Sequence, residues 1–262
     1  MMHLSSIHIY PLKSARGLSL DHVALDEFGL RSDRRWMVVD ATGRFISQRE
    51  CHRLALVTVG ITPEGLLIDG PGMTPLAIRF PAEEQREVPV QIWDDTCGGV
   101  DGGEAAAEWF TRFIGAPARI VYMPDGSFRR VNARYVPEPR RVSFADAYPI
   151  LLVGESSLAD LNRRMSSPLP MNRFRPNLVI TGSPPFAEDG WRSVRIGSLE
   201  FDIVKPCDRC VTTTIDQFTG EQGKEPLRTL ARFRKWNGQV YFGQNIVHRK
   251  IGTLAVGDAV TL

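Results

Sequence analysis

The chain has 262 residues, of which 43% are hydrophobic, so it can bury a sizeable core. Its formal net charge of +2 at pH 7 falls short of the strongly basic surface of a dedicated nucleic-acid-binding protein. No window approaches the roughly 18 uninterrupted apolar residues of a membrane span, and the start M-M-H-L-S-S-I-H-I-Y lacks the regions of a signal peptide, so we expect a cytoplasmic protein without a membrane partner.

The first half of the chain predicts β structure. From Leu4 to Trp93, short alternating or apolar runs are separated by Gly, Pro and Asp turns, which is typical of strands. The runs are S-I-H-I-Y, D-H-V-A-L-D, R-W-M-V-V-D, L-A-L-V-T-V-G-I and V-P-V-Q-I-W. Apolar residues then recur at helical spacing between glycines, so one helix is expected to close this half; they are Ala106, Trp109, Phe110 and Phe113.

The stretch from 123 to 143 predicts a linker, because it is rich in Pro and Arg and shows no sustained period. We therefore predict a β-rich N-terminal domain of residues 1–125 and a second domain of residues 126–262. The second domain contains a buried-looking I-L-L-V, helices in E-S-S-L-A-D-L-N-R-R-M and in 225–235, where Pro226 takes the first helical position, and a final turn and strand. Further strands are expected around N-L-V-I-T-G, S-L-E-F-D-I-V and V-T-T-T-I-D. Many short strands favour an α+β, predominantly β fold, with β-barrel cores and helices outside.

The four cysteines are sparse, and two of them lie three residues apart in K-P-C-D-R-C-V-T-T-T-I-D, residues 205–216. Such scattered cysteines do not make the disulfide framework of a small secreted domain. The pair is half of a zinc site at most, since no second pair exists and the five histidines lie far away in sequence. A thioredoxin-like dithiol needs a helix after its first Cys, whereas V-T-T-T-I-D is strand-like.

Two interpretations of the pair stay open at this point. Buried thiols act as small apolar groups in many proteins. Against this, Lys205 and Arg209 flank the pair and favour thiolate, while Pro206 and Asp208 break regular structure and would expose the thiols. A thiolate is a soft ligand for a heavy transition metal, and one would suffice if a cofactor supplied the other donor atoms.

Arginine dominates the basic residues. Only five of the 32 are lysines, so 32 − 5 = 27 are arginines, whose planar forks bind phosphate and carboxylate bidentately. A GC-rich genome explains such a surplus equally well, so only particular arginines carry weight.

Together these motifs resemble the MOSC superfamily, and in detail the bacterial relatives of the mitochondrial amidoxime-reducing component, over nearly the whole chain. The resemblance rests on the order and spacing of I-Y-P-L-K-S-A-R-G, D-R-R-W, S-Q-R-E, E-S-S-L-A-D-L-N, N-R-F-R-P-N, C-D-R-C-V-T-T-T-I-D with T-G-E, K-E-P-L-R-T-L, F-G-Q-N and V-G-D-A-V. It implies a MOSC-associated β-rich N-terminal domain followed by a β-barrel MOSC domain.

The resemblance also implies a molybdenum cofactor, a molybdenum–pterin whose metal takes two pterin sulfurs and one protein cysteine. Cys210 matches that metal ligand and is thereby the expected catalytic residue, with Cys207 as a neighbour. Pyridoxal phosphate binding is a further possibility at the level of the family.

Eleven further residues match positions that hold the cofactor: Lys13, Ser14, Arg34, Asp146, Ala147, Tyr148, Arg175, Asn177, Asp208, Arg209 and Asn245. Lys, Arg and hydroxyl donors suit the phosphate and polar edges of a pterin; the alternative for Arg34 and Arg175 is a surface salt bridge. The sequence departs from the family at A-D-A-Y, where relatives have a hydroxyl-rich turn, so contacts from Asp146, Ala147 and Tyr148 are expected through backbone groups.

By this resemblance the protein is a molybdenum oxidoreductase that reduces small N-hydroxylated substrates such as amidoximes or hydroxylated base analogues. Since no cysteine follows Cys210, electrons are expected from a separate ferredoxin- or flavodoxin-type protein and its NAD(P)H-dependent reductase. One alternative is a carrier of the molybdenum cofactor that uses the same residues. Another is RNA binding, suggested by aromatics beside Arg in S-F-R-R, R-F-R-P and R-F-R-K, but the near-neutral charge and missing RNP motif disfavour any nucleic-acid partner.

Overall fold

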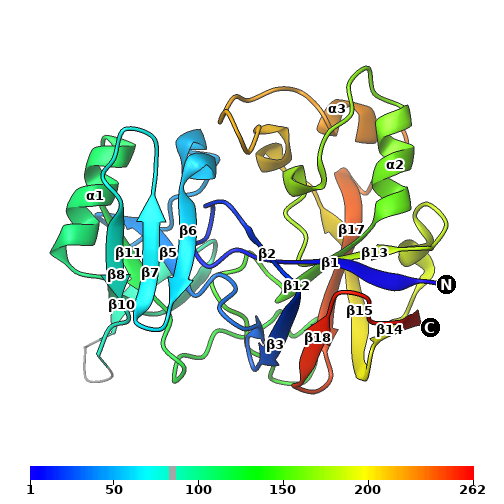
Figure 1. Cartoon of the computed structure of the whole chain (residues 1–262), viewed down its shortest axis with the longest axis horizontal. Coiled ribbons are helices and arrows are strands. Elements are labelled where there is room, and N and C mark those ends of the chain that lie inside the picture. The colour runs from blue at the N-terminus through cyan, green and yellow to red at the C-terminus, as the bar shows by residue number, and fades with distance from the viewer. Residues whose placement is uncertain (83–86) are drawn as a thin grey trace.

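Strands predominate over helices in the computed structural model, which describes residues 1–82 and 87–262 (Figure 1). This confirms the predominantly β fold that the alternating runs predicted. Two lobes lie side by side in Figure 1, one built on β5 to β11 and the other on β12 to β17. None of the described helices combines the length and apolar composition that crossing a bilayer requires.

The largest sheet draws its strands from both ends of the chain. Its order is β19-β14-β15-β17-β12-β13-β1-β2, with β16 also paired to β17. The strands are β1 (His3–Ile9), β2 (Leu18–Leu20), β12 (Ile150–Gly154), β13 (Leu178–Thr181), β14 (Ser193–Ile196), β15 (Leu199–Asp208), β16 (Lys235–Trp236), β17 (Gln239–His248) and β19 (Val260–Thr261). Strands β12 and β13 run parallel, and the other pairs are antiparallel.

The two ends of this sheet meet beside the chain termini. His3 forms a bridge with Ala259, and the Leu4 N–H donates to the Asp258 carbonyl at 2.9 Å. The sheet therefore curves round until β1 reaches the segment before β19, which brings the N and C ends to the same side of the molecule in Figure 1. The first strand thus packs with the second half of the chain, and the predicted division after residue 125 stays a prediction.

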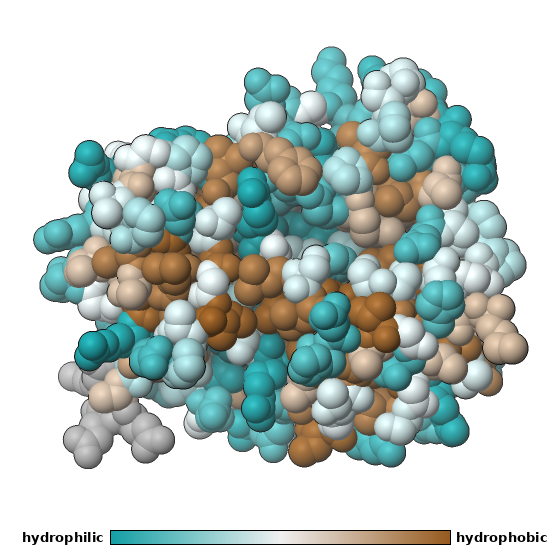
Figure 2. Space-filling model, viewed as in Figure 1, coloured by the Kyte–Doolittle hydropathy of each residue, from teal (hydrophilic) through white to brown (hydrophobic). Residues whose placement is uncertain are grey.

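Three smaller sheets build the rest of the molecule. They are β5 (Trp36–Asp40) with β11 (Ala118–Tyr122), β10 (Asp95–Asp101) and β9 (Val88–Ile92); β6 (Thr58–Thr62) with β7 (Gly65–Asp69) and β8 (Leu76–Arg79); and β18 (Thr253–Ala255) with β3 (His22–Asp26) and β4 (Gly29–Leu30). Figure 2 shows hydrophobic surface over β6, β7 and β8, where Ile61, Leu67 and Phe80 stay partly exposed.

Helix α1 (Glu104–Ile114) confirms the helical spacing read from the sequence. Trp109, Phe110 and Phe113 are buried in one cluster with Leu66 and Ile68 of β7. The helix ends at Gly115, whose φ of 83° is the left-handed conformation that favours glycine after a helix.

Helix α2 (Glu155–Arg163) also lies where it was predicted, but the helix expected over 225–235 is shorter. Only Leu227–Leu230 forms α3, because Lys235 and Trp236 pair with Gln239 and Val240 as β16 against β17. Single 3-10 turns η1 (His52–Leu56), η2 (Met171–Arg173), η3 (Ala187–Gly190) and η4 (Val211–Thr214) complete the described elements. Turn η1 replaces the first part of the strand expected in L-A-L-V-T-V-G-I.

The strand predicted in V-T-T-T-I-D is wrong. Val211–Thr214 forms η4, in which the Thr213 hydroxyl donates to the Cys210 carbonyl at 2.9 Å and the Thr214 hydroxyl donates to Val211 at 2.7 Å. These local bonds compensate for the β preference of the threonines. Pro206 and Asp208 lie inside β15, so they do not replace the strand by a loop, but the ladder to β17 shifts register between them, which is a local break in regular pairing.

His248 near the end of β17 makes stability depend on pH. Its side chain is buried and Nδ1 has no partner within the described residues, and burial lowers the pKa of His248 to about 4. Because the unfolded imidazole binds its proton near pH 6.5, stability is present above that pH and is lost as the pH falls toward 4. We expect wild type to lose about 2 kcal/mol more than His248→Gln between pH 7.5 and pH 5 in urea unfolding. Equal losses would contradict this assignment.

Candidate functional site

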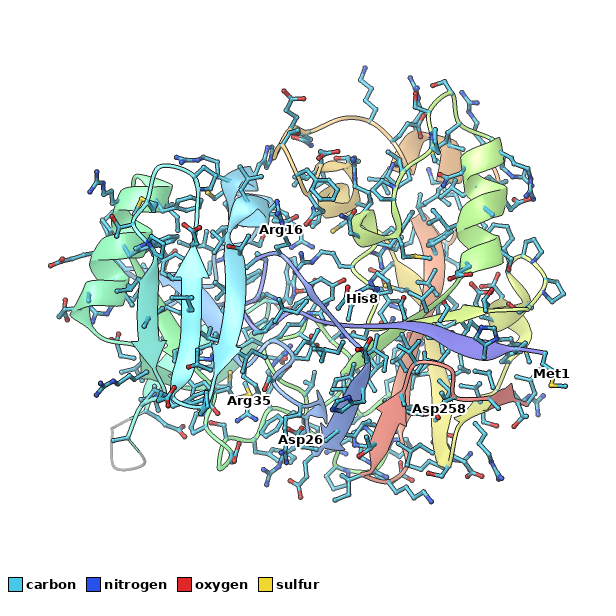
Figure 3. All side chains as sticks on the ribbon, in the orientation of Figure 1. Met1, His8, Arg16, Asp26, Arg35 and Asp258 are labelled. Carbon is cyan, nitrogen blue, oxygen red and sulfur yellow. The ribbon has the colours of Figure 1, made fainter. Side chains whose placement is uncertain are left out.

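A cavity of about 660 Å³ lies where the two halves of the chain meet. All twelve residues singled out in the sequence line it: Lys13, Ser14, Arg34, Asp146, Ala147, Tyr148, Arg175, Asn177, Asp208, Arg209, Cys210 and Asn245. Arg16 joins the two halves: it lies between the lobes in Figure 3 and donates to the Gln217 carbonyl at 3.1 Å. Segments far apart in the sequence therefore form one site.

Strained turns present several of these side chains. Four non-glycine residues of the lining have positive φ: Ser14 (71°), Arg34 (51°), Trp93 (54°) and Arg175 (53°). Non-glycine residues adopt this region at a cost of order 1–3 kcal/mol, and such residues cluster at functional sites. The strained backbone conformations at the cavity wall therefore point to a functional role for the placement of these side chains.

The cavity is electropositive. Seven cationic side chains line it: Lys13, Arg34, Arg49, Arg173, Arg175, Lys205 and Arg209. Three acidic ones accompany them: Asp94, Asp146 and Asp208. This excess of donors and positive charge suits an anionic ligand with phosphate or similar groups.

Lys13 and Asp146 form an ion pair across the cavity wall. The buried Lys13 ammonium donates to the Asp146 carboxylate and to the Phe144 carbonyl. Burial lowers the pKa of Lys13 to about 8, although Asp146 opposes the shift. Burial alone would raise the pKa of Asp146, but the charge of Lys13 outweighs it and holds that pKa below its usual range. The Asp146 side chain thus fixes Lys13, a role beyond the backbone contacts expected from the sequence.

Arg34 and Arg175 share the ring of Tyr10. Their guanidinium carbons lie 4.5 and 4.2 Å from its centroid. Arg34 also donates to Asp33 and, at 3.2 Å, to Asn177 Oδ1, and the charge of Asp33 outweighs burial and raises the pKa of Arg34. Arg175 forms no ion pair with any described residue, and burial lowers its pKa to about 10. Neither arginine is a surface salt bridge, the alternative that the sequence left open.

Cys210 lies at the start of η4 with its thiol beside Arg49. The Arg49 Nη2 donates to Cys210 Sγ at 3.0 Å, and its guanidinium carbon stacks 4.5 Å from the Trp93 ring centroid. Trp93 Nε1 in turn reaches Asp146 Oδ1 at 3.4 Å. The thiol is therefore held by Arg49 and Trp93 of the first half of the protein, which connect it to Asp146.

Cys207 takes a different environment from Cys210. Burial raises the pKa of its thiol, and Arg209 opposes the shift by donating from Nη1 to Cys207 Sγ at 2.9 Å. The side chain also packs against the cluster that contains Phe174 and Phe242. These contacts agree with the structural neighbour expected from the sequence.

The sequence-based list missed Arg49 and Trp93. Arg49 lies in S-Q-R-E, a motif noted for its position but not assigned a contact, whereas Trp93 ends a predicted strand and gave no functional signal. Their roles depend on a turn and a loop of the first half that approach Cys210 in space, which spacing along the chain does not encode.

The comparisons with known proteins cover both halves. Residues 1–117 match the MOSC N-terminal beta barrel domain and residues 139–261 the MOSC domain. Mitochondrial amidoxime reducing component 2 of Bos taurus is 34% identical over 275 residues, which span 98% of this chain and 82% of that protein. Component 1 of Homo sapiens is 32% identical over 277 residues, with 99% and 82% coverage. The crystal structure of the YUAD protein from Bacillus subtilis aligns with 99% of this chain and 94% of its own at 12% identity and a TM-score of 0.46. The resemblance inferred from the motifs is confirmed, and the chain belongs to the amidoxime-reducing component family of MOSC-domain proteins.

Proposed function

We propose that this protein is a molybdenum-cofactor-dependent oxidoreductase that reduces N-hydroxylated compounds. The observation that carries the proposal is the cavity itself, in which the Cys210 thiol lies among cationic donors from both halves of the chain. The family of named amidoxime-reducing components supports the reaction class.

The residues of the cavity fit an anionic cofactor that brings its own metal ligands. Within the described residues, no three His, Cys, Asp or Glu side chains gather to hold a metal by themselves, so a metal at Cys210 needs further ligands such as pterin sulfurs. The Nε of Arg209 is buried without a partner in the described chain, which leaves one donor for a ligand. Lys13, Arg34 and Arg175 would bind phosphate and pterin edges, and Cys210 would bind the metal.

The cofactor would supply the two-electron chemistry that breaks the substrate N–O bond, with two protons consumed and water released. The protein would contribute placement: Asp146 orients Lys13, Asn177 orients Arg34, and Arg49 orients the Cys210 sulfur. Electrons would come from a separate ferredoxin- or flavodoxin-type protein and its NAD(P)H-dependent reductase, in the cytoplasm.

Turnover separates a reductase from a cofactor carrier. Protein purified with bound molybdenum should convert benzamidoxime to benzamidine over many cycles when dithionite-reduced viologen is supplied, and should be inactive with NADH alone. Chromatographic quantification of benzamidine measures both. Molybdenum-loaded protein that makes no benzamidine would overturn the reductase proposal and favour a carrier, and rapid turnover with NADH alone would remove the need for a donor protein.

Arg49→Gln is expected to weaken retention of the cofactor by about 10–100-fold, because the groups that hydrogen-bond to a metal ligand affect metal affinity to that extent. Arg49→Lys should fall between this variant and wild type, since it keeps a charge but not the planar fork stacked on Trp93. Molybdenum remaining after graded dialysis is the measurement. Arg53→Gln in η1 is the matched control, because Arg53 donates to Phe113 and Pro71 carbonyls away from the cavity. Equal retention in Arg49→Gln and the control would contradict the assignment.

A further inference from the structure

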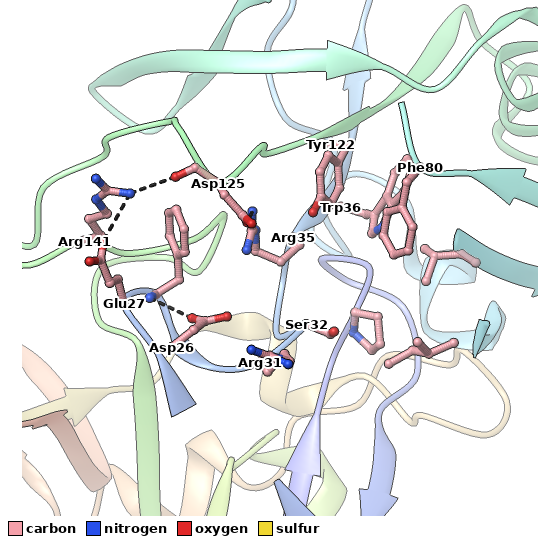
Figure 4. Close-up of a pocket in the computed structure, with 14 residues that line it drawn as sticks. Asp26, Glu27, Arg31, Ser32, Arg35, Trp36, Phe80, Tyr122, Asp125 and Arg141 are labelled. Carbon is pink, nitrogen blue, oxygen red and sulfur yellow. Dashed lines mark hydrogen bonds and ion pairs between the residues drawn. The ribbon is translucent and has the colours of Figure 1, made fainter. Parts of the chain in front are cut away.

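A second cavity, of about 530 Å³, lies on the other side of the D-R-R-W segment. Among the described residues the two cavities share no lining residue, yet Arg34 lines the first and its neighbours Arg35 and Trp36 line the second. Figure 4 shows this second cavity, with Trp36, Phe80 and Tyr122 at one side and Asp26 and Arg31 at the other.

The first side is an aromatic wall. The Trp36 centroid lies 4.9 Å from that of Tyr122 and 6.0 Å from that of Phe80, and the Phe80 and Tyr122 centroids lie 5.4 Å apart. Trp36 is buried, whereas Phe80 is 39% exposed and Ile61 beside it is 42% exposed. A partly exposed aromatic ring in a concave wall is a stacking surface for another ring.

The cavity lining also carries three carboxylates and three guanidinium groups. Two of each neutralise one another, since Arg35 pairs with Asp125 at 2.7 Å and Arg141 pairs with Glu27 at 3.2 Å. Within the described residues, Asp26 and Arg31 form no ion pair. Among the groups that the structure describes, the cavity therefore presents one unpaired negative group, Asp26, and one unpaired positive group, Arg31.

Asp26 and Arg31 are placed to act together. They lie on the hairpin of β3 and β4, where Asp26 pairs with Gly29 and the Arg31 N–H donates to the Ala24 carbonyl, so both side chains project from one face. Asp26 Oδ1 accepts the Phe28 N–H at 2.8 Å. Burial raises the pKa of Asp26 despite the charges of Arg35 and Arg31, which indicates a carboxylate short of compensating partners.

We propose that this cavity binds a small aromatic zwitterion of the α-amino-acid type. Its ring stacks on Phe80 and Tyr122, which are the accessible rings of the aromatic wall, its ammonium group pairs with Asp26, and its carboxylate pairs with Arg31. A net-neutral ligand with both charges matches a cavity whose own charges sum to zero. The proposal does not depend on the reductase function, because none of these residues lines the first cavity.

Calorimetric titration with four probes tests each part of the ligand. L-Phenylalanine should bind saturably, whereas phenethylamine, which lacks the carboxylate, and 3-phenylpropanoate, which lacks the amine, should each bind about tenfold more weakly. L-Alanine, which lacks the ring, should not bind. Absence of saturable L-phenylalanine binding up to about 10 mM would overturn the proposal. Phenethylamine that binds as tightly as L-phenylalanine would overturn the role of Arg31 and with it the zwitterion.

Two pairs of variants locate the binding. Asp26→Asn and Phe80→Ala should each weaken L-phenylalanine binding about tenfold or more, while the controls Asp21→Asn and Phe218→Ala bind like wild type, because both positions are exposed and lie outside the cavity. Thermal unfolding of each variant shows that it is folded. Unchanged binding in both Asp26→Asn and Phe80→Ala would place the ligand elsewhere and overturn the assignment.

Discussion

Replacing Cys210 by Ala is expected to reduce molybdenum in the purified protein from about one atom per chain to a small fraction of that value. Cys210 offers the thiol that Arg49 contacts at 3.0 Å inside the electropositive cavity. A thiolate is the soft ligand that such a metal prefers, and alanine offers no donor atom in its place. The remaining cationic residues would still attract the pterin, so the loss should be larger for the metal than for the organic part.

The measurement is elemental analysis of wild type and variant expressed in a host that makes the cofactor. Cys51→Ala is the matched control, because Cys51 packs against the core cluster of β6, β7 and α1 instead of lining the cavity. Molybdenum retained by Cys210→Ala at the wild-type level would remove Cys210 as the metal ligand. Zinc in place of molybdenum in wild type would overturn the proposed cofactor altogether.

The elements that the sequence predicts well are those with a sustained local period. Helix α1 follows from the spacing of Ala106, Trp109, Phe110 and Phe113, whose burial needs only one apolar face. The three threonines of V-T-T-T-I-D predict a strand because of their β preference, whereas the chain forms η4, in which the hydroxyls of Thr213 and Thr214 donate to carbonyls three residues back. Such competition between local bonds and strand pairing depends on which partner strand lies nearby.

The site was predictable only through family resemblance. Its residues run from Lys13 to Asn245, and nothing in their spacing brings them together, since the curved sheet joins both ends of the chain. The sequence did not single out Arg49 and Trp93, because their importance arises from their mutual stacking and from the contact of Arg49 with a thiol 161 positions away in the chain. The pairing of Lys13 with Asp146 is equally a product of the fold.

Arg173→Ala is expected to lower the free energy of unfolding by about 3–5 kcal/mol, since it removes a buried, hydrogen-bonded charge. Arg173 is 5% exposed and donates to the carbonyls of Thr213 at 3.0 Å and Thr214 at 2.7 Å, and to Asp216 Oδ2 at 3.1 Å. Alanine would leave these acceptors without their donor in a closed part of the structure. Arg163→Ala is the control, because Arg163 is 65% exposed and its pair with Asp160 contributes about 1 kcal/mol or less.

Urea unfolding gives the free energy of unfolding of both variants. A similar small loss in each would show that Arg173 stabilises the fold no more than the exposed Arg163 does.

Arg173→Ala should also lower molybdenum content in protein that remains folded. The reason is that Arg173 holds the two carbonyls at the end of η4, and η4 begins directly after Cys210. A destabilised variant that keeps full molybdenum would separate the two effects and show that the cofactor itself can order this turn. Stability and metal content that fall together would instead mean that the thiol is positioned by the fold before the cofactor binds.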